Sequence, residues 1–190
     1  MSAPNKRRWE PGFSQPALIA HRGFAGRYTE NTMEAFRAAV EAGAQGIELD
    51  IHRSAGGEAV VYHDFTLSRL HGDSRPIAAV ERSELGDLGI PTLEELFAAF
   101  GSTIVYDVEI KSKSRRPAGV EVEAVRLVRR YGLHDRVLFS SFNPHTLAAL
   151  ASVAPEIPRA LIYAREPEVP LLLRNGWGRY LVSVSALKPR

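Results

Sequence analysis

Short apolar runs alternate with segments of helical period along most of this chain. Seven runs are predicted to be strands, and they cover residues 17–21, 46–53, 59–63, 103–111, 136–142, 158–163 and 180–187. Between most of them, apolar residues recur every three or four positions, which is the period of an amphipathic helix. Strands separated by helices favour a parallel sheet with helices packed outside it.

Capping signals mark the first two predicted helices. We expect the first helix to begin at Asn31 or Thr32, with Glu34 as the capping-box partner of Asn31, and to end at Gly43. The next helix is predicted to begin at Thr92, with Glu95 three residues later in the same relation.

Two further helices are marked by prolines. Pro117 is predicted to open a helix that ends at Gly132, because Pro fits the first turn and Gly suits the position after the last. The pair Asn143-Pro144 reads as a cap followed by a proline in the first helical position, and this helix should end before Pro155.

One connection is too short for a crossover helix. The runs 47–53 and 59–63 are separated by five residues that include Gly56 and Gly57, and such a spacing predicts a β-hairpin. We therefore expect six barrel-type strands and one hairpin excursion. Residues 1–16 contain three prolines and read as a lead-in, partly disordered, before one domain over residues 17–190.

Composition narrows the possible function. The 190 residues are 45% hydrophobic and carry a formal net charge of +2, which favours one globular domain and does not favour a nucleic-acid binder. The absence of cysteine excludes disulfides and thiolate metal sites. No signal peptide or membrane-spanning run is recognised, so we expect a cytoplasmic protein without an integral membrane segment.

Carboxylates occupy alternate positions of two predicted strands. In residues 46–52 the period of two places Glu48 and Asp50 on one face, about 7 Å apart, and apolar residues on the other. Residues 107–111 repeat the pattern with Asp107, Glu109 and Lys111. One such strand alone could be an edge strand with its polar face in water. The repetition favours convergence of Glu48, Asp50 and Glu109 at a barrel mouth, in an all-oxygen site for a hard divalent cation.

Histidines and cations follow other predicted strands. His21 and Arg22 end the first strand, and His63 ends the third. A lone histidine at a strand end is more often a structural hydrogen bonder, but beside a carboxylate cluster it can exchange protons near neutral pH. Arg22 and Lys111 could supply the positive charge that a phosphoryl group requires. The other four histidines are expected to be structural or exposed: His52, His71, His134 and His145.

Taken together, these segments resemble the glycerophosphodiester phosphodiesterase family. The resemblance is carried, in order, by His21-Arg22-Gly23, Glu30-Asn31-Thr32, Glu48-Leu49-Asp50, His63-Asp64 with Arg69, Pro91-Thr92-Leu93-Glu94-Glu95, Glu109-Ile110-Lys111 and Ser141-Phe142. Each motif is weak alone, but their order and spacing between residue 18 and about residue 145 make the match specific.

The resemblance implies an α/β fold of the TIM-like (β/α) barrel type and hydrolysis of glycerophosphodiesters to glycerol 3-phosphate and an alcohol, with Mg²⁺ or Ca²⁺. It implies that Glu48, Asp50 and Glu109 are the metal ligands and that His21 and His63 are the acid/base pair. On the same basis, Arg22 and Lys111 bind the phosphate.

The sequence also departs from the family pattern. The segment from His63 to Pro91 is short, and two later strands with Trp-Thr-Val-Asn-like and Thr-Asp-Arg-Pro-like motifs are absent, which leaves about six of eight barrel strands. Open edges of this kind could pair two copies into a homo-oligomer. The alternatives are an impaired family member that binds metal or a partner chain, and a hydrolase for a lysophospholipid or phosphoinositide.

Overall fold

The fold is a curled, mostly parallel sheet with helices on its outer side. The computed structural model describes residues 17–164, 174 and 182–189. Its strands are β1 (Ile19–His21), β2 (Gly46–Arg53), β3 (Ala59–Val61), β4 (Val105–Ile110), β5 (Val137–Ser141), β6 (Arg159–Tyr163) and β7 (Ala186–Pro189). The strand order is β1-β2-β4-β5-β6-β7, with every neighbouring pair along it parallel.

The sheet curls into an incomplete barrel. In a flat sheet, the four steps from β2 to β7 would separate these strands by about 19 Å. Yet the Lys188 Nζ atom on β7 lies 3.2 Å from an oxygen of Glu48 on β2. A lysine side chain cannot bridge the flat distance, so the strands must bend around a common interior. The predicted incomplete TIM-like barrel is confirmed.

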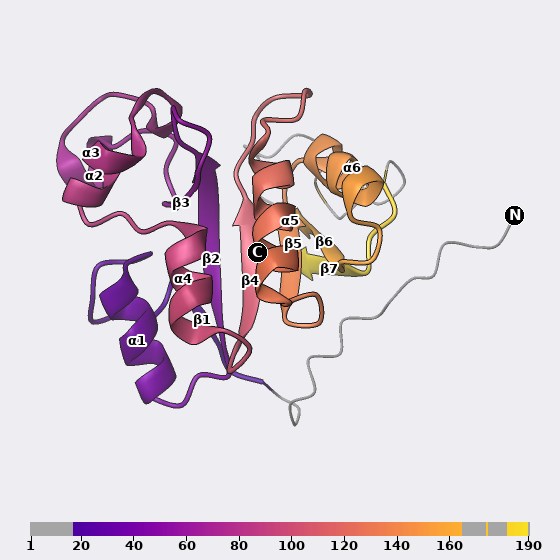
Figure 1. Ribbon diagram of the computed structural model, residues 1–190, viewed down its shortest axis with the longest axis horizontal. Coiled ribbons are helices and arrows are strands. Elements are labelled where there is room, and N and C mark those ends of the chain that lie inside the picture. Colours follow the sequence, from indigo (N-terminus) through magenta and orange to yellow (C-terminus); the bar gives the residue numbers. More distant parts are fainter. Residues whose placement is uncertain (1–16, 165–173, 175–181, 190) are drawn as a thin grey trace, which may run out of the picture.

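The predicted hairpin is also confirmed. The strand β3 pairs antiparallel with β2 alone of the named strands, in the register Ile51↔Val61 and Arg53↔Ala59. After β3 the chain forms short helical segments that gather beyond the carboxyl end of β2, at the upper left of Figure 1. These segments, which the sequence patterns did not predict, are α2 (Ser68–His71), the 3₁₀ helix η1 (Ile77–Ala79) and α3 (Arg82–Asp87).

The longer helices follow the predicted order. They are α1 (Met33–Glu41), α4 (Leu93–Phe100), α5 (Val120–Tyr131) and α6 (Pro144–Val153), and Figure 1 shows α4 and α5 in front of β2 and β4. The main core forms between these helices and the outward residues of the strands, such as Leu49 and Val108. A smaller apolar core, which includes Tyr62, Leu67 and Leu85, anchors the excursion after β3.

Two of the predicted caps are confirmed. Thr92 caps α4 and forms a reciprocal capping box with Glu95. Asn143 caps α6, and Pro144 occupies the first turn. Both signals are local because the cap and the backbone N–H that it binds are only two or three residues apart. A cap of this kind therefore forms from residues close in sequence, whatever the helix packs against.

Of the two residues predicted to begin the first helix, Thr32 is the cap and Asn31 is not, and the predicted start of the third helix was wrong. Thr32 caps α1 by accepting from the Ala35 N–H, whereas Asn31 adopts a positive φ of 58° and donates its amide to Asp50. The helix α5 begins at Val120 rather than at Pro117, because the carboxylate at Glu121 accepts hydrogen bonds from the two backbone N–H groups before the helix.

Most strand boundaries differ from the prediction by one or two residues. The strand predicted over residues 180–187 is observed at Ala186–Pro189, and residues 180 and 181 lie outside the described residues. The predicted lead-in over residues 1–16 also lies outside them. In the parts of the chain that the structure describes, every helix is too short or too polar to cross a bilayer.

Candidate active site

Three carboxylates meet on the concave face of the sheet. One oxygen from each of Glu48, Asp50 and Glu109 lies within 4.8 Å of the others, and all three residues are buried. Pairing of β2 with β4 sets this arrangement, since the register places Asp50 beside Glu109 and Glu48 beside Asp107. Two oxygens bound to one Mg²⁺ or Ca²⁺ are separated by at most about 5 Å, so the cluster fits such a cation.

Two lysines partly neutralise the carboxylates. The Lys111 Nζ atom lies 2.7 Å from Glu109 Oε1 and 3.0 Å from Asp50 Oδ1. Lys188 Nζ lies 2.8 Å from Asp107 Oδ2 and 3.2 Å from Glu48 Oε1. Four carboxylates thus face two ammonium groups, which leaves two negative charges when all are ionised. One divalent cation would balance them.

Burial makes the cluster electrostatically uneven. The pKa of Glu48 is raised to about 7, mainly by burial. The positive charge of Lys188 lowers this pKa, but the neighbouring carboxylates raise it. Burial alone would also raise the pKa of Asp50, but Lys111 and the amide of Asn31 outweigh it and hold that pKa below its usual value. The cluster therefore includes a firmly ionised carboxylate beside one that binds a proton readily without an ion.

Arg22 is held beside this cluster by a strained turn. Its φ of 55° is unusual for a residue with a side chain, and its N–H donates to the Glu48 carbonyl at 2.8 Å. The next residue, Gly23, is required because a Cβ there would lie 2.7 Å from the Ala35 backbone. The turn therefore points a guanidinium toward the carboxylates.

The guanidinium keeps one donor available. Arg22 donates through Nη1 to both carboxylate oxygens of Glu30 at 3.1 Å. Its Nε atom lies 3.4 Å from Asp50 Oδ2 without forming a hydrogen bond, and this buried nitrogen has no hydrogen-bond acceptor among the described residues. Such a donor suits a phosphate oxygen of a substrate.

Both predicted histidines lie at the site. His21 Nε2 is 3.7 Å from Glu48 Oε2, and its side chain is 68% exposed. His63 Nδ1 is 2.7 Å from Asp64 Oδ1, and its side chain is 21% exposed. One imidazole is thus open to solvent at the end of β1, whereas the other is oriented by a carboxylate after β3.

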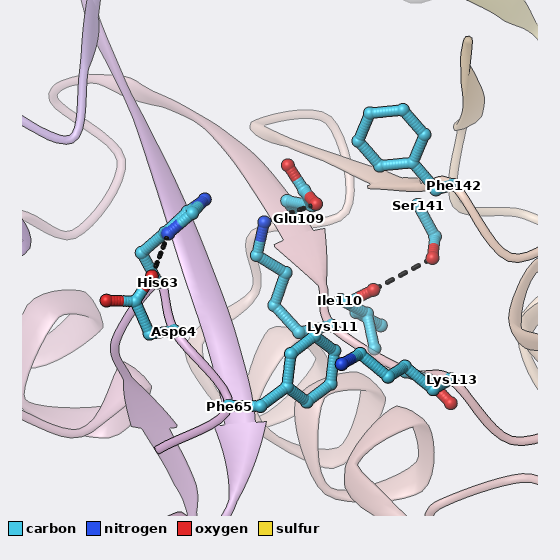
Figure 2. A pocket seen from close by; sticks show the side chains of 10 residues that line it. His63, Asp64, Phe65, Glu109, Ile110, Lys111, Lys113, Ser141 and Phe142 are labelled. Atoms are coloured by element: carbon cyan, nitrogen blue, oxygen red, sulfur yellow. Dashed lines mark hydrogen bonds and ion pairs between the residues drawn. The ribbon is translucent and has the colours of Figure 1, made fainter. Parts of the chain in front are cut away.

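A cavity of about 320 Å³ opens beside the cluster (Figure 2). Figure 2 shows His63 on one side of it, Lys111 and Glu109 in the middle, and Phe142 with Ser141 on the other side. The Phe65 ring forms part of its wall, with Lys113 Nζ 4.2 Å from the ring centroid. Its lining is His63, Asp64, Phe65, Glu109, Ile110, Lys111, Ser112, Lys113, Ser141 and Phe142.

The sequence reasoning missed several residues of this site. Asn31 was interpreted as a helix cap, and the shape of its motif offered no sign that its amide would reach Asp50. Lys188 carried no signal, because it reaches Glu48 across 140 residues of chain.

His52 is buried, with Nε2 3.2 Å from the His63 carbonyl, and burial lowers its pKa to about 4. A neutral, structural His52 agrees with the prediction for that residue.

Comparison with known proteins agrees with this geometry. Residues 21–184 match the model of the glycerophosphoryl diester phosphodiesterase family. The chain is 33% identical over 160 residues to a glycerophosphodiester phosphodiesterase from Caldanaerobacter subterraneus. This aligned region covers 77% of this chain and 66% of that protein. It thus spans about two thirds of the length of the curated relatives it matches.

Solved structures share the fold. A glycerophosphodiester phosphodiesterase from Thermotoga maritima superposes with a TM-score of 0.73 at 28% identity, over 93% of this chain and 75% of that one. A phosphodiesterase from Oleispira antarctica, solved with the product sn-glycerol 3-phosphate, gives 0.76 at 26% identity over 92% and 74%. With a converging acidic site, an incomplete barrel and a family match over most of its length, this chain belongs to the glycerophosphoryl diester phosphodiesterase family.

Proposed function

We propose that this protein hydrolyses glycerophosphodiesters to glycerol 3-phosphate and an alcohol, with a bound Mg²⁺ or Ca²⁺. The observation that carries the proposal is the meeting of Glu48, Asp50 and Glu109 within 4.8 Å at the mouth of a family-typical barrel. The Oleispira antarctica relative, solved with sn-glycerol 3-phosphate, supports this choice of product.

The three carboxylates would hold the cation. Oxygen ligands suit Mg²⁺ and Ca²⁺, and the two uncompensated negative charges favour a divalent ion. When bound, the ion polarises the phosphoryl oxygens and stabilises the negative charge that develops in the transition state. Lys188 anchors Glu48 and Asp107 from the opposite side of the curl, and so keeps the carboxylates in place.

Arg22 and Lys111 would bind the phosphate. Arg22 Nε has no hydrogen-bond acceptor among the described residues, and a phosphate oxygen bound beside the cluster would provide one. The Lys111 ammonium lies between Asp50 and Glu109 at the floor of the cavity, where it can contact a second phosphate oxygen. These contacts would fix the phosphorus with respect to both histidines.

His21 and His63 would exchange the two protons of the reaction. One imidazole accepts the proton of the attacking hydroxyl as its oxygen bonds to phosphorus. The other donates a proton to the alkoxide as the bond between phosphorus and the leaving oxygen breaks. Their positions at the ends of β1 and β3, which both pair with the carboxylate strand β2, place an imidazole of each strand near the carboxylates and support this division of labour.

The test is release of glycerol 3-phosphate from glycerophosphocholine with Mg²⁺, Ca²⁺ or EDTA. We expect turnover with one of the cations and none with EDTA, and loss of turnover in His21→Ala and Glu48→Ala. The control is Glu41→Gln, an exposed acid at the end of α1, which should behave as the unaltered protein.

Assaying size-exclusion fractions also tests the predicted homo-oligomer, because activity confined to a larger species would show that the open edges pair. Unchanged turnover in both alanine variants would refute the proposed site. A folded protein whose melting temperature rises with the cation but which cleaves no diester would support the alternative, an impaired family member that binds metal.

A further inference from the structure

A chain of alternating charges connects His63 to Arg22. His63 Nδ1 contacts Asp64 Oδ1 at 2.7 Å, and Arg69 Nε donates to the other Asp64 oxygen at 2.5 Å. Arg69 also donates to Glu30, and Glu30 accepts both hydrogen bonds from Arg22 Nη1. The proposed acid/base histidine and the proposed phosphate ligand are thus ends of one network.

The network joins two separate parts of the chain. Arg22 and Glu30 lie on the segment between β1 and α1, whereas Asp64 and Arg69 belong to the excursion after β3. The contact between Glu30 and Arg69 spans 39 residues of sequence and is the link between them. The side chains of Arg22 and Glu30 are only 12% and 17% exposed, so solvent weakens this half of the network little.

Both acids of the network are firmly ionised. Burial alone would raise the pKa of Asp64, but the hydrogen bonds from Arg69 and His63 hold it below its usual value. In the same way, Arg69 and Arg22 outweigh burial and lower the pKa of Glu30. An ionised carboxylate only accepts hydrogen bonds, so the proton of a neutral His63 must be on Nδ1.

The second ring nitrogen of His63 is then the one that reacts. Figure 2 shows Nε2 on the side of the ring away from Asp64, on the side of Lys111 and Glu109. The backbone is held as well, because the His63 carbonyl contacts the buried His52 ring at 3.2 Å. Asp64 therefore sets the ring orientation and the tautomer of His63, and His52 holds its backbone.

We propose that Asp64 is a positioning residue that keeps His63 in the Nδ1–H tautomer, and that Arg69 and Glu30 hold this pair in register with Arg22. Proton exchange with the substrate then takes place at His63 Nε2, opposite a phosphate held by Arg22. This inference rests on the proposed function for its kinetic consequence, whereas the tautomer is a property of the folded protein alone.

The first test is a long-range ¹H–¹⁵N NMR spectrum of protein labelled at histidine nitrogens, with His63→Gln used to assign the signals. At a pH where the ring is neutral, we expect His63 to show protonated Nδ1 and unprotonated Nε2. In Asp64→Asn the amide can donate or accept, so the spectrum should move toward a mixture of tautomers. A wild-type ring protonated at Nε2 would overturn the inference, whatever the enzymatic activity.

The second test is kinetic. For Asp64→Asn we expect kcat to fall on the order of 10²-fold with KM changed less than about threefold, since general acid/base catalysis is lost while binding remains. Arg69→Met should lower kcat about 10-fold, Arg69→Lys should restore part of it, and the double variant should be no worse than Asp64→Asn, because both residues act through one histidine.

The matched control is the pair Asp73 and Arg75. These residues form a similar carboxylate–guanidinium pair on the same excursion, with Arg75 Nη2 2.6 Å from Asp73 Oδ2. Asp73→Asn should therefore keep both the kcat and the His63 tautomer of the unaltered protein. If Asp64→Asn matches this control in kcat and tautomer, the inference is wrong. If the unaltered protein cleaves no diester, the proposed function fails, and the NMR result alone decides the role of Asp64.

Discussion

The two faces of β2 and β4 are almost equally buried, yet they contain opposite chemistry. Leu49 and Val108, on the outer face, are 0% exposed, and Asp50 and Glu109, on the inner face, are 1% and 6% exposed. Burial on the outer face removes apolar surface from water, which stabilises the fold by about 25 cal/mol per Å². Burial on the inner face removes charges from water, which costs free energy unless each is paired.

This difference separates stability from function on the same strands. The outer residues would stabilise the sheet with or without a cation. The inner carboxylates repel one another, and Lys111, Lys188 and a bound cation would relieve the repulsion. Substitutions on one face should therefore affect properties that substitutions on the other face leave unchanged.

The largest expected effect is on turnover and comes from the inner face. Asp50→Asn and Glu109→Gln should each lower kcat/KM by roughly 10³-fold. Each variant loses a carboxylate ligand, so the cation binds more weakly and supplies several kcal/mol less transition-state stabilisation. Steady-state release of glycerol 3-phosphate measures this. Glu109→Gln should unfold without added metal at a denaturant concentration no lower than the unaltered protein. If this variant loses stability instead, the inner face is structural and the comparison fails.

The next effect is on stability and comes from the outer face. Leu49→Ala should lower the free energy of unfolding by about 3 kcal/mol, since it removes a fully buried side chain from the main core. Urea unfolding gives the value. The cation should raise the melting temperature of this variant as much as that of the unaltered protein. Loss of the cation response would mean that packing on the outer face also shapes the site.

A smaller effect concerns the pH dependence of stability without metal. In the folded protein the pKa of Glu48 is raised from its ordinary 4.5 to about 7. Burial is the main cause, and the neighbouring carboxylates add to it while Lys188 opposes it. The folded state therefore binds this proton more tightly than the unfolded chain, and the free energy of unfolding decreases as pH rises through that window.

Glu48→Gln removes this contribution. Relative to the unaltered protein, the variant should gain roughly 2 kcal/mol between pH 5 and pH 8 in urea unfolding with EDTA. His52, whose pKa burial lowers to about 4, adds the opposite slope, but it does so in both proteins and cancels in the difference. An equal pH profile for the two proteins would show that Glu48 is already ionised at pH 5.

The smallest effect is a proton count. At pH 6 the Glu48 carboxyl is mostly protonated, whereas a cation binds the carboxylate, so binding of Mg²⁺ or Ca²⁺ should release about one proton. Isothermal titration calorimetry in two buffers of different ionisation enthalpy gives the number. At pH 8 the release should approach zero, which is the internal control. No release at pH 6 would place the cation away from Glu48.

The comparison also explains what could be predicted. The alternation of Glu48 and Asp50 with Leu49 is visible in the sequence because neighbouring side chains of a strand point to opposite faces. The caps at Thr92 and Asn143 were predictable for a similar reason, since each depends on residues two or three positions away. Asn31 has equally good local signals for a cap, but a buried carboxylate on β2 offers its amide a stronger partner.

The sequence by itself determined which residues share a face, where most helices begin, and which oxygen and nitrogen groups were available for chemistry. Only the tertiary structure decided the pairing of Asp50 with Glu109, the reach of Lys188 to Glu48 and the link from Arg69 to Glu30. Local geometry follows from the covalent chain, whereas these contacts join residues 39 to 140 positions apart and depend on how the strands curl together.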